Sequence, residues 1–144
     1  GLLNLTVPVN RPNGKNTLVK EVIINYDENW QKDHIKAIES AYRSAPFYDF
    51  FAKDLIQIIK SRQKYLVDLN IELTQFISQS LGLKIDIKKG TESDSASIPS
   101  KIALLPKERE NHAGKSYQQV FLLPDQFEGN LSSLDLLFNC GKKY

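Results

Sequence analysis

Three consecutive segments between residues 30 and 80 carry apolar side chains at helical spacing, and this pattern most constrains the fold. The apolar stripe of the first segment is Ile35, Ile38, Tyr42 and Ala45, and Pro46 ends it. The second stripe is Phe47, Phe51, Leu55 and Ile58, widened by Phe50 and Ile59. The third is Leu66, Leu69, Leu73, Phe76 and Ile77, with Gly82 as the C-terminal cap. The pattern predicts three amphipathic helices that each bury one face.

Two short runs with β-like composition precede the helices. Residues 5–9 are apolar and β-branched but contain Pro8, which is typical of an edge strand or a strand end. In residues 18–26, Leu18, Val22, Ile24 and Tyr26 favour one face of a second strand. Because the intervening Asn13-Gly14 step favours a turn with positive φ, we predict an antiparallel hairpin over residues 4–26.

The chain after the third helix predicts short strands, loops and one more helix. Alternation over residues 83–87 indicates a half-exposed strand, and residues 102–105 and 117–121 predict two others. Residues 90–100 are small and polar and predict a surface loop. A helix from Ser133 to Asn139, ended by Gly141, closes the chain. The order predicts an α+β fold, with a small, mostly antiparallel sheet packed against three to four helices.

The length of 144 residues predicts a single domain over residues 1–144. Because the chain contains no methionine, we expect that an N-terminal segment is missing. The 19 basic and 17 acidic side chains are intermixed, which argues against nucleic-acid binding. No apolar run approaches the roughly 20 residues that span a membrane. With a single cysteine, these features indicate a cytoplasmic protein.

No metal or cofactor site is expected. Two histidines in unrelated contexts and one cysteine do not supply three or four ligands at a usable spacing. The sequence Gly114-Lys115-Ser116 is similar to the end of a P-loop, but Arg109 stands where that motif needs its first glycine. We therefore expect neither a metal ion nor a bound nucleotide cofactor.

His34 follows Trp30 by one helical turn in the first predicted helix. Because the pKa of histidine lies near neutrality, His34 is a candidate general base or proton donor. The alternative is a partly buried histidine that hydrogen-bonds the backbone. The sequence leaves both interpretations open.

Ser132 and Asp135 have the spacing of a capping box, with aspartate in place of glutamate. The Ser132 hydroxyl would accept from the Asp135 amide, and the carboxylate would reach back to the Ser132 amide. The alternative is a catalytic carboxylate. Asn139 is either a polar helix stop or a ligand-binding amide.

Tyr117, Gln119 and Phe121 lie on one face of a predicted strand. Alternating aromatic and polar groups are typical of a ligand pocket wall. They are equally typical of a core strand whose glutamine is hydrogen-bonded. Both interpretations remain.

Five stretches in the same order resemble the WbqC-like family of bacterial proteins. They are Leu5–Val9, Asn29–His34, Ser40–Phe47, Tyr117-x-Gln119-Val120-Phe121, and Asn130-Leu131-Ser132-x-x-Asp135 through Asn139-x-Gly141. The chain differs from the family in lacking an N-terminal segment and residues between the third helix and Tyr117. The motif positions that match include Trp30, His34, Tyr42, Tyr117, Gln119, Asp135 and Asn139.

The resemblance implies a role in bacterial surface-polysaccharide (O-antigen) biosynthesis, with transfer of an acyl or aminoacyl group such as glycine onto an amino sugar. Under that hypothesis His34 takes the proton and Asp135 orients it, while Gln119 and Asn139 hold the acyl oxygen or sugar hydroxyls. Trp30, Tyr42 and Tyr117 would provide stacking faces. The alternative is a non-enzymatic module that binds a sugar nucleotide or a protein. The sequence does not decide between them, nor does it indicate an oligomeric state.

Overall fold

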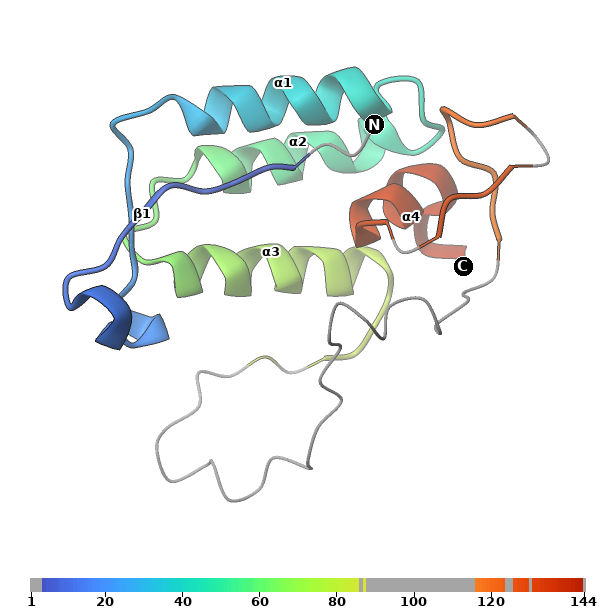
Figure 1. Cartoon of the computed structure of the whole chain (residues 1–144). Coiled ribbons are helices and arrows are strands. Elements are labelled where there is room, and N and C mark those ends of the chain that lie inside the picture. The colour runs from blue at the N-terminus through green and yellow to red at the C-terminus, as the bar shows by residue number, and fades with distance from the viewer. Residues whose placement is uncertain (1–3, 86, 88–115, 124–125, 130, 144) are drawn as a thin grey trace.

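The computed structural model describes residues 4–85, 87, 116–123, 126–129 and 131–143. In this part of the chain the helices are α1 (Trp30–Tyr42), α2 (Tyr48–Lys60), α3 (Leu66–Ser80) and α4 (Ser133–Cys140). Strands β1 (Val9–Asn10) and β2 (Ile23–Ile24) form a small antiparallel sheet. Helices α1, α2 and α3 run alongside one another, and α4 lies near the C-terminal end of α3 (Figure 1). The predicted α+β fold class is confirmed, with a mostly helical content.

The three amphipathic helices form where their apolar stripes predict them. Leu55 of α2 and Leu69 of α3 are almost fully buried between the helices. Helix α2 is rotated slightly from the predicted face, because its buried positions are Tyr48, Ala52, Leu55 and Ile59. Phe50 was expected to widen the apolar face, but its side chain is 75% exposed. The rotation of α2 turns this residue outward.

Helix α3 ends in a Schellman motif around Gly82. This glycine has a φ of +75°, and its N–H donates to the Gln79 carbonyl at 3.0 Å. The N–H of Leu83 donates to the Ser78 carbonyl at 2.8 Å. These two bonds satisfy carbonyls that the end of a helix leaves open. The predicted glycine cap is confirmed.

The predicted hairpin is present but much shorter than residues 4–26. Its register pairs Val9 with Ile24 and Asn10 with Ile23. The turn at Asn13-Gly14 is confirmed, since Gly14 has a φ of +55°. Residues expected at the start of the second strand instead form a 3₁₀ turn, η2 (Val19–Glu21), and Val19 is 71% exposed.

In the described residues the sheet has two strands, and the segment before α3 adds hydrogen bonds on the outer side of β2. In the described residues β1 has β2 as its one partner strand, so it is an edge as predicted, and Pro8 just before it has no N–H to extend the ladder. The other side of β2 pairs with the start of α3, because Leu66 N–H donates to the Val22 carbonyl and Ile24 N–H to the Lys64 carbonyl, each at 3.0 Å. These bonds hold the N-terminal segment against the helices.

Two further strand predictions were wrong, because the described residues of both segments do not form strands. Residues 83–85 and 87 have no strand conformation, and Leu83 and Ile85 are more than half exposed. Residues 117–121 form a segment and turn without a partner strand, because Val120 N–H bonds to a side chain of α4. The predicted elements at 90–100 and 102–105 lie outside the described residues. In the described part of the chain no helix has the length and apolarity to cross a membrane.

Candidate functional site

Asp135 is the centre of a buried hydrogen-bond network between α4 and residues 117–120. It is 0% exposed. Its Oδ2 accepts from the Tyr117 hydroxyl at 2.7 Å and from Gln119 Nε2 at 2.9 Å. Its Oδ1 accepts from Asn139 Nδ2 at 3.3 Å. Three donors converge on one carboxyl group, an arrangement suited to an ionised acceptor.

Gln119 is also 0% exposed, and its amide acts like a strand partner for Glu128. Its Oε1 accepts from the Glu128 N–H at 2.8 Å, and its Nε2 donates to the Glu128 carbonyl at 3.0 Å. Asn139 completes the connection, because its Oδ1 accepts from the Val120 N–H at 2.9 Å. Together these side chains hold residues 117–120 and the segment around Glu128 against α4.

Tyr42 brings the end of α1 to the same carboxylate. Burial raises the pKa of Tyr42 to about 12, aided by the charge of Asp135 and hydrogen bonding to it. Its ring packs on Phe121 and Phe138, with centroids 5.6 and 5.1 Å away. Burial, followed by hydrogen bonding to Asp135 and its charge, also raises the pKa of Tyr117. Both phenols therefore keep their protons and remain donors at neutral pH.

This network accounts for the predicted site residues Tyr42, Tyr117, Gln119, Asp135 and Asn139. The structure brings these five together, whereas the site hypothesis placed Trp30 and His34 with them. Among the described residues, no buried side-chain nitrogen or oxygen lacks a hydrogen-bond partner. A carboxylate occupied by several protein donors is a poor general base, because accepting a proton would break those bonds. The geometry instead connects elements of the fold.

The predicted capping box was half right. Ser132 is the N-cap of α4 and its hydroxyl accepts from the Leu134 N–H at 3.3 Å, whereas the Asp135 N–H bonds to the Ser132 carbonyl. The Asp135 carboxylate does not reach back to the cap. It is turned inward, because Tyr117 and Gln119 offer it buried donors.

Trp30 and His34 lie in a separate cluster near the start of α1. Trp30 is 4% exposed, and its Nε1 donates to the Asn25 carbonyl at 3.1 Å. Its ring lies between Tyr26 and His34, with centroids at 5.8 and 5.0 Å. A ring buried in this way offers little open surface to a sugar, and the stacking role of Trp30 stays a prediction.

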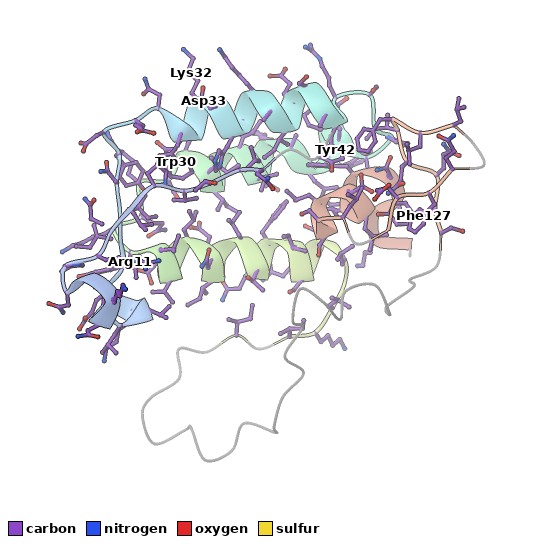
Figure 2. The ribbon with its side chains drawn as sticks, viewed as in Figure 1. Arg11, Trp30, Lys32, Asp33, Tyr42 and Phe127 are labelled. Carbon is purple, nitrogen blue, oxygen red and sulfur yellow. The ribbon has the colours of Figure 1, made fainter. Side chains whose placement is uncertain are left out.

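His34 does not contact Asp135 as the proton-transfer hypothesis required. Its Nε2 lies 3.1 Å from the Thr6 carbonyl oxygen. Tyr42, the residue of α1 that reaches Asp135, is eight positions further along the helix, roughly 12 Å at the usual rise per residue. Figure 2 shows Trp30 and Tyr42 near opposite ends of α1. Asp135 therefore does not orient His34.

A hollow between the start of α1 and the end of α2 has a volume of about 320 Å³. Its lining residues are Asn29, Gln31, Lys32, Ile35, Lys36 and Lys60. Gln31 fixes one wall, because its Nε2 donates to the Ile59 carbonyl at 2.5 Å. Lys32 projects outward from α1, on a different side from Trp30 (Figure 2). The hollow thus combines amides, cations and one apolar side chain.

None of these six lining residues was among the predicted site residues. The i,i+4 spacing of Lys32 and Lys36 was visible in the sequence and places them on one helix face. Lys60, however, follows 24 positions after Lys36, and only the packing of α2 beside α1 brings it near. In the described residues no group of three or more His, Cys, Asp or Glu side chains is placed to hold a metal ion.

The WbqC-like protein family matches residues 1–112. Since this is more than half of the chain, the chain belongs to that family. The segments around Tyr117 and Asp135 lie outside the matched residues. Neither a curated protein nor a solved structure matches the chain significantly.

Proposed function

We propose that this chain is a non-enzymatic binding module for a saccharide in bacterial surface-polysaccharide (O-antigen) biosynthesis, acting in the cytoplasm. The observation that carries the proposal is the hollow beside α1, with two amide side chains next to an apolar one. Membership of the WbqC-like family supports the biological setting. The separation of His34 from Asp135 favours binding over catalysis, because the predicted acid–base pair is not formed.

The chemistry of the hollow suits a sugar. Asn29 and Gln31 can both donate and accept, as sugar hydroxyls require, while Ile35 offers an apolar surface for ring C–H groups. The amide nitrogen of Gln31 donates to the Ile59 carbonyl, which leaves the amide oxygen to accept a hydrogen bond from a sugar hydroxyl. A small number of polar groups around an apolar surface is the usual composition of a ligand site.

An Asn29→Ala variant tests this proposal. Asn29 is exposed and its side chain makes no capping hydrogen bond, so we expect unchanged thermal stability. We expect a roughly three- to tenfold weaker binding of N-acetylglucosamine, the loss of about one hydrogen bond, measured by NMR titration. Chemical-shift changes in the wild type should centre on Gln31 and Ile35.

Asn70→Ala is the matched control, since Asn70 is an exposed asparagine on α3. It should bind the sugar like the wild type. Shift changes that avoid Gln31 and Ile35, or equal binding by the Asn29→Ala variant, would place the sugar elsewhere. Absence of binding to any amino sugar would count against the proposed function.

The second candidate is acyl or aminoacyl transfer, such as glycine transfer, onto an amino sugar, and the hydrogen bond of His34 favours it. The Thr6 carbonyl can only accept, so His34 Nε2 carries the proton of this bond. That tautomer leaves Nδ1 as the nitrogen able to take a proton from an acceptor amine.

The transferase candidate predicts that His34→Ala lowers the transfer rate about 100-fold or more, because a general base contributes on the order of 10²–10⁴. His34→Gln serves as a second variant that retains a donor for the Thr6 carbonyl. If either variant transfers glycine to an amino sugar at the wild-type rate, His34 has no part in proton transfer.

A further inference from the structure

Three lysine residues line the hollow beside α1. Lys32 and Lys36 are one turn apart on α1, and Lys60 is the last residue of α2. We propose that these three ammonium groups bind the phosphate or diphosphate of an activated sugar. The inference rests on the proposed function and narrows its ligand from a saccharide to a phosphorylated one.

In the described residues no ion pair within 4.0 Å involves Lys32, Lys36 or Lys60, although Asp33 lies in the same turn of α1 as Lys32. There the ion pair that forms on α1 joins Arg43 to Glu39 at 3.3 Å, near the far end of the helix. Lys32 and Lys36 repel one another at their i,i+4 spacing. A bound anion would relieve this repulsion and would satisfy several ammonium donors at once.

The end of α2 would by itself disfavour an anion, because helix carbonyls give that end a partial negative charge. Two features offset this effect. Gln31 Nε2 donates to the Ile59 carbonyl at 2.5 Å, so this carbonyl already has a hydrogen-bond donor from the protein. Lys60 places a full positive charge at the same position. Both features reduce the negative charge that the end of α2 presents to the hollow.

The size and charge of the hollow select a small anion. Its volume of 320 Å³ lies at the lower end of ligand pockets, which hold roughly 300–1,000 Å³. Three lysines supply fewer contacts than the phosphate groups of a nucleic acid usually receive. Lysine binds phosphate as a point charge without requiring the paired geometry of arginine. A diphosphate with an attached sugar meets these conditions.

The test measures binding by calorimetry with the full chain and three probes: inorganic pyrophosphate, UDP-N-acetylglucosamine and N-acetylglucosamine. The variant Lys32→Gln/Lys36→Gln/Lys60→Gln removes the cluster and keeps the side chains polar. The control Lys15→Gln/Lys20→Gln/Lys84→Gln removes the same charge from three other exposed lysines. Thermal melting of both triple variants checks that they fold.

We expect pyrophosphate and the nucleotide sugar to bind the wild type and the control. In the cluster variant their affinity should fall at least tenfold. Binding to the wild type should also weaken as salt rises, because exposed charges are screened. N-acetylglucosamine alone should bind more weakly than its nucleotide-linked form and respond little to loss of the cluster.

Two results would overturn the inference. One is equal affinity of the wild type and the cluster variant for the nucleotide sugar. The other is equal affinity of the wild type for the sugar with and without its diphosphate. Both leave the proposed function standing. Pyrophosphate binding through the cluster without any binding of either sugar would show an anion site that takes no activated sugar, and it would contradict both the inference and the saccharide function.

Discussion

Replacing Asp135 with alanine is expected to destabilise the protein by about 3–5 kcal/mol, comparable to removing one partner of a buried charged pair. The substitution deletes the acceptor of Tyr117, Gln119 and Asn139 in a region closed to solvent. Each buried hydrogen bond that is lost costs about 1–3 kcal/mol, offset in part by the bonds that remain, such as those from Asn139 Nδ2 to the backbone carbonyl of residue 135 and from Gln119 Nε2 to the Glu128 carbonyl. Urea unfolding followed by circular dichroism measures the difference.

The stability of the Asp135→Asn variant should lie between those of the wild type and Asp135→Ala. Its single oxygen can keep the place of Oδ2, which serves Tyr117 and Gln119, but its amide then faces the donating amide of Asn139. The matched control is Asp54→Ala, because Asp54 is exposed on α2 and should change stability by less than about 0.5 kcal/mol. A loss below 1 kcal/mol for Asp135→Ala would show that the network contributes little.

The tyrosine titration gives a second readout of the same variants. The pKa of Tyr42, about 12, is raised first by burial and then by Asp135. In Asp135→Asn the charge is gone, so we expect the pKa to fall part of the way toward 10 while the contribution of burial remains. Absorbance at alkaline pH, where phenolate forms, follows the change.

Local sequence signals predicted much of the fold. The apolar stripes placed α1, α2 and α3, since each stripe needs only the period of one helix. Gly82 and Ser132 predicted helix ends because caps depend on a few neighbouring residues. Leu83–Ile87 and Tyr117–Phe121 misled for the opposite reason. A strand needs a partner, and alternation in one segment does not show whether another segment lies beside it.

The candidate sites show the same distinction. Of the seven residues predicted to share a site, five lie in one network, namely Tyr42, Tyr117, Gln119, Asp135 and Asn139, because buried polar groups must find partners. The sequence could not predict that protein partners occupy the hydrogen-bonding groups of these side chains. That depends on the segment around Glu128, which folds against Gln119. His34 was placed in the same group because the sequence does not show which turn of α1 packs near α4, which lies about 100 residues further along the chain. The lysine hollow depends on the same missing information.

Phe138→Ala is expected to cost about 3–5 kcal/mol, because the removed ring is 0% exposed and leaves a cavity. The ring packs on Tyr42 of α1 and Tyr48 of α2, with centroids at 5.1 and 5.4 Å. The ring is therefore an apolar contact of α4 with both α1 and α2. Urea unfolding should give the loss, and amide exchange should quicken in α4 before it does in α3.

Phe50→Ala is the matched control for this substitution. It removes the same ring from a side chain that is 75% exposed, so its effect should stay within about 0.5 kcal/mol. The backbone hydrogen bond from Phe47 N–H to the Phe138 carbonyl, at 3.0 Å, does not depend on the ring and should survive. A difference in stability between the two variants therefore measures the contribution of the buried Phe138 ring. Equal stability of the two variants would mean that α4 is not packed on α1 and α2 through Phe138.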